Sequence, residues 1–80
     1  MCTEVNRRFG RFLADKRLDI PLKQVEVAQR VGISQAHISA IELGNRSVTL
    51  DLALRICNAL GADMCEFIES EIDNEKTLAV

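Results

Sequence analysis

The segment SQAHISAIE, residues 34–42, contains a group of side chains that are short and nearly all uncharged. Glutamine can make paired hydrogen bonds to the edge of adenine, and the methyl group of alanine can contact that of thymine. A helix that meets only water usually carries Glu and Lys pairs, so small polar residues indicate close approach to a partner. The chemistry available here is therefore the reading of base edges. The residues concerned are Gln35, Ala36, Ser39 and Ala40.

The spacing of apolar residues predicts two short helices that position this group. Between residues 23 and 42, apolar residues recur at a helical period on both sides of Gly32. Gly32 suits the left-handed position that ends a helix, and Ser34 suits the N-cap of the next one. Burial of Ile38 and Ile41 would leave the small polar residues exposed. The second helix is thus presented as a probe of the width that a DNA major groove accepts.

Length and composition indicate one small helical domain. The chain has 80 residues, of which 48% are hydrophobic, with four glycines, one proline and no run of strand-like alternation. Such a chain is too small for a large catalytic cleft. No apolar run reaches the roughly 18 to 20 residues that span a bilayer, and no secretory signal opens the chain. We therefore expect a soluble, cytoplasmic protein that does not contact a membrane.

The cysteines indicate neither a disulfide framework nor a metal site. Cys2, Cys57 and Cys65 are odd in number, lack metal-ligand spacing and accompany a single histidine. We expect Cys57 and Cys65 to be buried as small apolar groups, with a redox role as the less favoured alternative. Carboxylates do not cluster beside a nucleophile, and there is no Gly-rich phosphate loop, so we expect neither an enzyme nor a bound cofactor or metal.

The charge is divided unevenly along the chain, although the net charge of −2 is unusual for a nucleic-acid binder. Residues 1–46 hold eight Lys and Arg against five Asp and Glu, a balance of +3, whereas residues 47–80 hold two against seven, a balance of −5. The half that contains the predicted probe is therefore the basic half. An acidic half that faces away would limit nonspecific attraction to phosphate. The alternative is that both halves are merely solvated.

Three further helices are predicted around this pair. The first runs from about Glu4 to Leu18 and ends before Pro21, with a basic side formed by Arg7, Arg8, Arg11 and Lys16. The next is capped by Thr49 and ends at Gly61, after the loop 44–47. Its expected core residues are Leu50, Ala53, Leu54, Ile56, Cys57 and Leu60.

A last helix, capped by Asp63, is predicted to be short and unusually apolar. Its apolar face extends beyond what a small core covers, which indicates a homodimer surface with Phe67 and Ile72 as the best candidates. Core packing is equally expected for Met64 and Ile68. We assign residues 1–70 to the helix-turn-helix DNA-binding domain and residues 71–80 to a flexible or dimer-associated tail, with residues 73–80 frayed or bound to a partner.

Several linked segments from Phe9 to Ile68 resemble the lambda repressor and Cro-like helix-turn-helix family, also called the XRE family. This similarity implies a compact, all-α, five-helix fold, and it extends to phage repressors and to the controller proteins of restriction-modification systems. Pro21 stands where the family often has Gly, which changes the turn. The matching segments are FGRFLADKR, LKQVEVAQRVGISQAHISAIE, LGNRSVTLDLALRICNALG and ADMCEFI.

The resemblance implies roles for single residues. Gln35, Ala36 and Ala40 match base-reading positions, with Ser39 and His37 at the edges, and Gln24 at the start of the second helix is expected to hold a phosphate. For Gln35 the alternative is ordinary helix surface, for His37 a plain exposed histidine, and for Arg46 a solvated loop charge. The expected DNA-backbone contacts are Lys23, Gln24, Ser34, His37, Asn45 and Arg46.

Arg17 and Glu42 match a family pair that bridges the first helix to the end of the third. We predict a partly buried ion pair that orients the probe helix and does not read DNA.

The leading hypothesis is therefore a homodimeric transcription regulator that binds double-stranded DNA at a palindromic operator, with half-sites about 34 Å apart. The rival is a protein-interaction module, such as an antitoxin that clamps a partner through the last helix and the tail. Activation of transcription would need a patch that faces RNA polymerase, for which Asp51, Glu66 and Glu69 are candidates.

Overall fold

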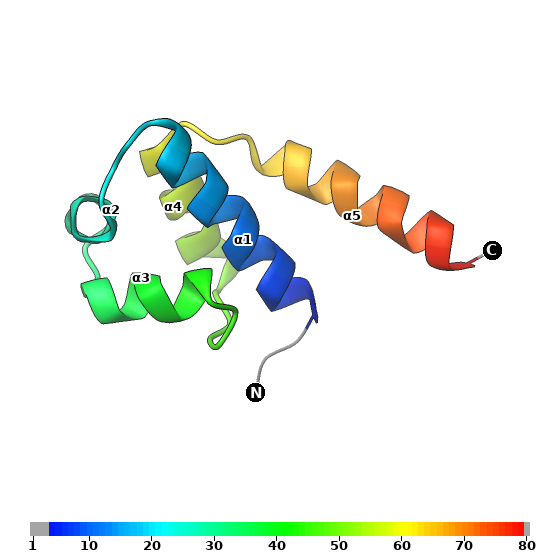
Figure 1. The fold of residues 1–80 in the computed structure, drawn as a ribbon, viewed down its shortest axis with the longest axis horizontal. Coiled ribbons are helices and arrows are strands. Elements are labelled where there is room, and N and C mark those ends of the chain that lie inside the picture. Colours follow the sequence, from blue (N-terminus) through cyan, green and yellow to red (C-terminus); the bar gives the residue numbers. More distant parts are fainter. Residues whose placement is uncertain (1–3, 80) are drawn as a thin grey trace.

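The structure is a computed structural model that describes the backbone of residues 4–79 and the side chains of residues 4–73 (Figure 1). Over these residues the chain forms helices and no strand, so the predicted all-α, five-helix architecture is confirmed, with the helix-turn-helix at the second and third helices. Cys2 and Val80 lie outside the described residues. The helices are α1 (Glu4–Asp19), α2 (Gln24–Val31), α3 (Gln35–Glu42), α4 (Leu50–Leu60) and α5 (Met64–Ala79).

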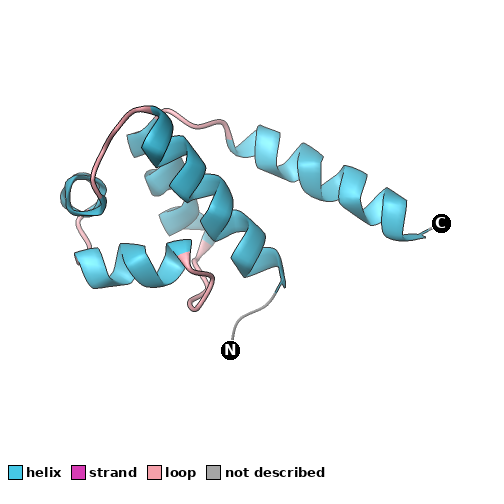
Figure 2. Cartoon of the chain, viewed as in Figure 1, coloured by secondary structure: helices cyan, strands magenta, loops and turns pink. Residues whose placement is uncertain are grey.

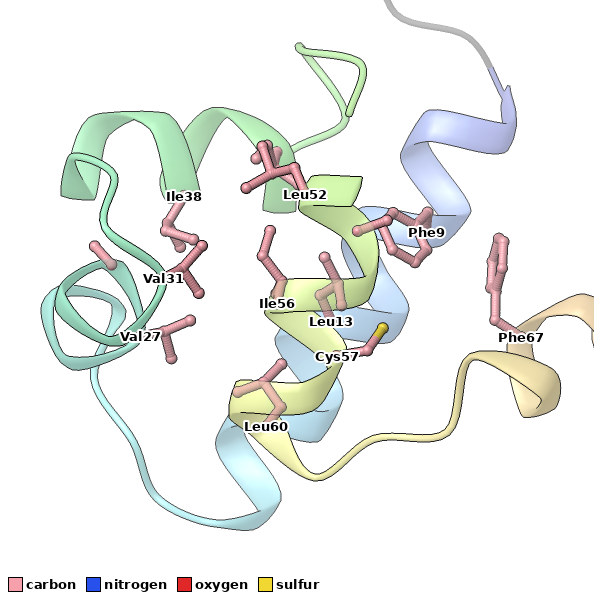
Figure 3. Close-up of a cluster of buried hydrophobic side chains, with 13 residues drawn as sticks. Phe9, Leu13, Val27, Val31, Ile38, Leu52, Ile56, Cys57, Leu60 and Phe67 are labelled. Carbon is pink, nitrogen blue, oxygen red and sulfur yellow. The ribbon is translucent and has the colours of Figure 1, made fainter. Parts of the chain in front are cut away.

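The core lies where α1, α2, α3 and α4 meet. Each of these helices supplies one of the largest fully buried side chains. Figure 3 shows Leu13, Val27 and Ile56 pointing into this core. They lie on the faces that the helical period predicted, because removal of apolar area from water fixes which side of a helix turns inward. The four residues are Leu13, Val27, Ile41 and Ile56.

The buried face of α4 differs from the predicted one. Leu50 is 70% exposed and Leu54 is 48% exposed, whereas Leu52, which we did not expect in the core, is buried. The buried residues Leu52, Ile56 and Leu60 are spaced by one helical turn. Leu54 is two residues from both Leu52 and Ile56, a rotation of about 200° that turns it to the opposite face. The prediction that Leu50 and Leu54 belong to the core is therefore wrong.

α5 is longer than predicted. It continues without a break past residue 70, where we expected the tail to begin, and ends at Ala79. A helix that has already started extends readily through Glu, Lys, Leu and Ala. That residues 71–80 form a flexible or dimer-associated tail, with residues 73–80 frayed or bound to a partner, stays a prediction. The C-terminal half of α5 projects away from the other helices (Figure 2). None of the described helices has both the length and the apolar character to cross a bilayer.

A cluster of three aromatic rings joins α5 to α1. The ring centroid of Phe67 lies 5.1 Å from that of Phe9 in an edge-to-face arrangement and 5.5 Å from that of Phe12. Phe67 is only 9% exposed and belongs to the core of the monomer. Our prediction that Phe67 forms a dimer surface is corrected accordingly, since a ring enclosed by aromatic partners offers little area to a second chain.

Two ion pairs flank the aromatic cluster. Arg8 donates from Nε and Nη2 to the two carboxylate oxygens of Glu71 at 2.7 and 2.9 Å, and Lys16 Nζ lies 2.9 Å from Glu66. The hydrogen bonds from Arg8 lower the pKa of Glu71, and the hydrogen bonds to Glu71 raise the pKa of Arg8. α5 is thus held to α1 by one buried ring and by charges that remain in contact with water.

Candidate nucleic-acid interface

The turn between α2 and α3 is fixed by local hydrogen bonds. The backbone of Gly32 has a left-handed φ of 86° and donates its N–H to the carbonyl oxygen of Ala28 at 2.8 Å. Two residues later, the Ser34 hydroxyl accepts the backbone N–H of His37 at 3.1 Å. Both caps were predicted from the sequence and are confirmed. They stop one helix and start the next within three residues, which sets the direction of α3.

α3 divides sharply into a buried and a solvent-facing side. Ile38 and Ile41 are each 2% exposed and anchor the helix in the core. Gln35 and Ala36 are exposed, while Ser39 and Ala40 are partly exposed. The four side chains that we predicted to read bases therefore share the outer part of one anchored helix, where their short length allows another surface to come near.

The predicted DNA-backbone contacts lie on both sides of α3. Lys23 and Ser34 are exposed on the α2 side, and Asn45 and Arg46 are exposed in the loop that follows α3. His37 is partly buried, and its backbone N–H is taken by the Ser34 cap. Cations and hydrogen-bond donors are therefore exposed at both ends of α3.

The partly buried ion pair predicted from the sequence joins α1 to the end of α3. Arg17 donates from Nε and Nη2 to the carboxylate of Glu42 at 2.7 and 3.0 Å, and from Nη1 to the carbonyl oxygen of Leu22 at 2.8 Å. The side chain of Arg17 is 14% exposed and that of Glu42 is 9% exposed. The bonds to Glu42 raise the pKa of Arg17. This two-pronged geometry fixes both partners more firmly than a single contact would.

The side chain of Gln24 also binds Glu42 of this ion pair. We predicted the ion pair but not this additional contact. Its side-chain amide donates to Glu42 at 2.9 Å, so the residue expected to hold a phosphate is tied to the end of α3. An amide nitrogen has two N–H donors, so one donor can bind Glu42 while the other is available to a phosphate. The Glu42 carboxylate thereby fixes the start of α2, the end of α1 and the end of α3 relative to one another.

Gly10 brings the backbones of α1 and α3 into close approach. A methyl group at this position would overlap the carbonyl oxygens of Ile41 and Glu42. Glycine inside a helix costs about 1 kcal/mol relative to alanine, so its presence there is itself a sign of close packing. A glycine inside the predicted first helix is visible in the sequence, but we did not predict close packing of α1 from it. Together with the ion pair, Gly10 holds the end of α3 against α1.

Exposed apolar side chains lie on α1, α2, α4 and α5, and Leu43, directly after α3, is 64% exposed. Ile72, our remaining dimer candidate, is 46% exposed, and Ile68, for which core packing was an equal alternative, is also 46% exposed. A groove of about 290 Å³ lies between α1, α4 and the start of α5. Its apolar lining consists of Val5, Phe9, Val48, Leu50, Ala53, Met64 and Phe67.

The two described cysteines do not form a reactive site. Cys57 is buried, as predicted, and burial raises the pKa of its thiol. Cys65 is exposed, so its predicted burial is wrong: its helix begins at the Asp63 cap, which accepts the Cys65 N–H at 2.9 Å and leaves the side chain outside. The negative charge of Asp63 raises the pKa of the Cys65 thiol. Because the thiolate is the reactive form, neither environment favours redox chemistry.

Comparison with known proteins agrees with this geometry. A family model described as helix-turn-helix, HTH_3, matches residues 13–67. A protein of Methanothermobacter thermautotrophicus named as an uncharacterized HTH-type transcriptional regulator is 41% identical over 56 residues, which cover 70% of this chain and 81% of that protein.

Solved structures share the fold. The restriction-modification controller protein C.AhdI from Aeromonas hydrophila is 27% identical with a TM-score of 0.73, over 78% of this chain and 90% of that one. The controller protein C.Esp1396I, solved as a tetramer with its natural 35 base-pair operator, is 21% identical with a TM-score of 0.76, over 89% of this chain and 93% of that one. The chain therefore belongs to the HTH_3, XRE-type helix-turn-helix family of transcriptional regulators.

Proposed function

We propose that this protein is a sequence-specific regulator that places α3 in the major groove of double-stranded DNA. The observation that carries this proposal is the outer side of α3, where small, uncharged side chains lie on a helix whose other side is anchored by Ile38 and Ile41. Gln35 would make paired hydrogen bonds to an adenine, and Ala36 and Ala40 would contact thymine methyl groups or allow close approach.

The same docking brings the flanking groups to phosphates. Asn45 and Arg46 would contact one side of the groove, and Lys23, Gln24 and Ser34 the other, with His37 at the edge of the base-reading surface. The ion pair of Arg17 with Glu42 would hold these two sets at a fixed separation. Such contacts set the orientation of a protein on DNA, whereas base contacts select the sequence.

We propose further that the protein acts as a homodimer on a palindromic operator. The exposed apolar residues on α4 and α5, in particular Leu54, Ile68 and Ile72, supply area for a two-fold contact. In such a dimer the two α3 helices would enter half-sites about 34 Å apart. The operator-bound tetramer of C.Esp1396I is a precedent for assembly on this fold. We place this activity in the cytoplasm.

Selection of bound duplexes from a random library, followed by the variant Gln35→Ala, tests the proposal. An inverted repeat is expected, and Gln35→Ala is expected to lose about 1 to 3 kcal/mol of binding free energy at one base position of each half-site. The matched control is Gln29→Ala, which removes the same side chain from an exposed position on α2. An equal loss on every DNA sequence would contradict base reading by Gln35.

The exposed apolar surface also favours a second function, a protein-interaction module that clamps a partner as antitoxins do. This surface includes Leu50 at 70% exposure and Ile72 at 46%. Retention of the purified protein on duplex DNA, measured across a salt series, separates the two functions. Salt-sensitive retention supports the regulator, and no retention at low salt supports the interaction module.

A further inference from the structure

The last turn of α3 leads into an exposed leucine that takes no part in the core. Leu43 is the C-cap residue of α3 and is 64% exposed. It belongs neither to the buried core residues nor to the partly buried apolar residues that pack against them. Among the exposed large apolar residues of the described part of the chain, it alone lies in α3 or at an end of α3. The small polar surface of α3 therefore ends in one large apolar side chain.

The backbone of Leu43 still has helical geometry, so the period of α3 applies to its side chain. Its φ is −81° and its ψ is −8°, and its N–H donates to the carbonyl oxygen of Ser39 at 3.1 Å, as in an α-helical turn. The helical path ends only at the next residue, Gly44, which has a left-handed φ of 79°. Leu43 is therefore placed by α3 and not by the loop that follows.

Leu43 lies on the outermost line of α3. Successive residues of an α-helix are about 100° apart around its axis. Ile38 and Ile41 mark the buried direction, and both Ala36 and Leu43 lie within about 10° of the direction opposite to it. Leu43 is seven residues beyond Ala36, which is about 10 Å along the axis. The line that would enter a groove most deeply thus begins at Ala36, passes close to Ala40 and ends at Leu43.

Contacts on both sides of Leu43 fix the end of α3. Glu42 accepts hydrogen bonds from Arg17 at 2.7 and 3.0 Å. The backbone of Gly44 packs directly on α1, since a Cβ atom there would lie 2.7 Å from the Cα of Arg7. A side chain that selects a base has to project from a backbone held in this way. Leu43 meets that requirement although it is the cap of its helix.

The outer side of α3 is long at its two ends and short in the middle. Gln35 at the start and Leu43 at the end have long side chains, whereas Ala36, Ser39 and Ala40 between them are short. The floor of a DNA groove curves around the axis of the duplex, so a straight helix lies nearest to it in the middle and farther from it at both ends. Longer side chains at the ends are therefore the ones that can still reach base edges there.

We propose that Leu43 is a further specificity-determining residue, which contacts the C5 methyl group of a thymine in the major groove. This inference rests on the proposed function. An isobutyl side chain has no hydrogen-bonding group, so the base feature that it can recognise is apolar, and the C5 methyl group of thymine is the apolar group that base pairs present in the major groove. Contact between the two removes the area of both from water, which favours thymine over cytosine at that position.

The test measures binding of full-length protein to the selected operator and to versions in which one thymine of a half-site is replaced by deoxyuridine, which lacks only the C5 methyl group. For one such thymine, the wild-type protein is expected to bind the deoxyuridine version about fourfold more weakly, the value for one buried methyl-sized group. Leu43→Ala is expected to bind both versions equally at that position and to keep the methyl dependence of any other thymine. Leu18→Ala is the matched control, because Leu18 on α1 is 62% exposed, and it is expected to behave as the wild type.

Two outcomes would overturn the inference. In one, no thymine loses its methyl dependence in Leu43→Ala. In the other, Leu43→Ala weakens binding by the same factor with and without each methyl group, which would place Leu43 against a sugar or a protein partner. Leu43→Met keeps an apolar side chain of similar size and is expected to retain the methyl dependence.

Two further measurements keep the result interpretable. Helix content measured by circular dichroism identifies a variant that does not fold, in which case Leu43→Ser replaces Leu43→Ala in the same comparison. Selection of duplexes by the wild-type protein separates this inference from the proposed function. If the wild type selects an inverted repeat and Leu43→Ala keeps every methyl dependence, only the role of Leu43 fails, whereas a wild type that selects no sequence rejects the proposed function itself.

Discussion

α3 and α5 are attached to the same body of the protein in opposite ways. α3 has only eight residues, yet two of its side chains are almost completely buried and its last residue joins a partly buried ion pair. α5 has sixteen residues, but among its described side chains, residues 64–73, only Phe67 is buried. Two ion pairs with α1, whose members keep access to water, add to this contact.

The difference indicates where this fold requires precision. A helix that reads bases must hold its side chains within a fraction of an ångström, which calls for buried contacts at both ends. A helix that supplies area to a partner needs only to be present at the surface, so exposed charges and one aromatic ring are sufficient. The comparison predicts that disturbing the contacts of α3 affects the whole domain, whereas disturbing those of α5 has local effects.

The largest effect is expected at the ion pair that fixes α3. Arg17→Met leaves the carboxylate of Glu42, whose side chain is only 9% exposed, without its cation and is expected to lower the free energy of unfolding by about 3 kcal/mol or more. The double variant Arg17→Met with Glu42→Met removes both charges and is expected to lose less. Urea denaturation followed by circular dichroism measures both, and equal losses in the single and double variants would count against this account.

A smaller and more local effect is expected from Phe67→Ala. Loss of the buried ring is expected to cost about 3 kcal/mol, at the low end for such changes because Phe67 lies at the edge of the core. Amide hydrogen exchange should show α5 losing protection while α3 stays protected. Ile68→Ala is the control, since it truncates an exposed neighbour. Uniform loss of protection over the whole chain would mean that α5 is not a separate unit.

The smallest effect concerns the pH dependence of the contact between Arg8 and Glu71. Arg8 lowers the pKa of Glu71 in the folded protein, so the contact stabilises α5 above the ordinary glutamate pKa of about 4.3 and is lost as the pH falls through the lower folded value. Glu71→Gln should remove this part of the acid dependence. NMR titration of the Glu71 side-chain carboxyl measures it, and a pKa at or above the ordinary value would contradict the pairing.

Much of the candidate nucleic-acid interface could be predicted because its determinants are local. The caps at Gly32 and Ser34 and the burial of Ile38 and Ile41 follow from residue type and helical period, which operate within one or two turns. The exposure of Gln35 follows from the same period. We did not predict the hydrogen bond between Gln24 and Glu42, since it joins residues eighteen positions apart, nor the close approach of α1 and α3 at Gly10.

Less of α4 and α5 could be predicted, because both are rich in apolar residues on more than one side. In α4 the spacing of apolar residues is compatible with more than one buried face. Whether Leu52 or Leu54 is buried depends on where α1 and α2 lie. In α5 the assignment of Phe67 to the core and of Ile68 to the surface depends on Phe9 and Phe12. Amphipathic spacing predicts an apolar stripe along a helix. Where a helix has several stripes of similar hydrophobicity, only the packing partner determines which of them is buried.

The sequence by itself determined the helical architecture, the position of the turn and the outward side of α3, since hydrophobic period and capping chemistry act between residues near each other in the chain. Only the tertiary structure decided which cations of α1 pair with the carboxylates of α5 and which residues share the carboxylate of Glu42. Those outcomes depend on distances between segments that are far apart in sequence, and these distances arise only when the core has packed.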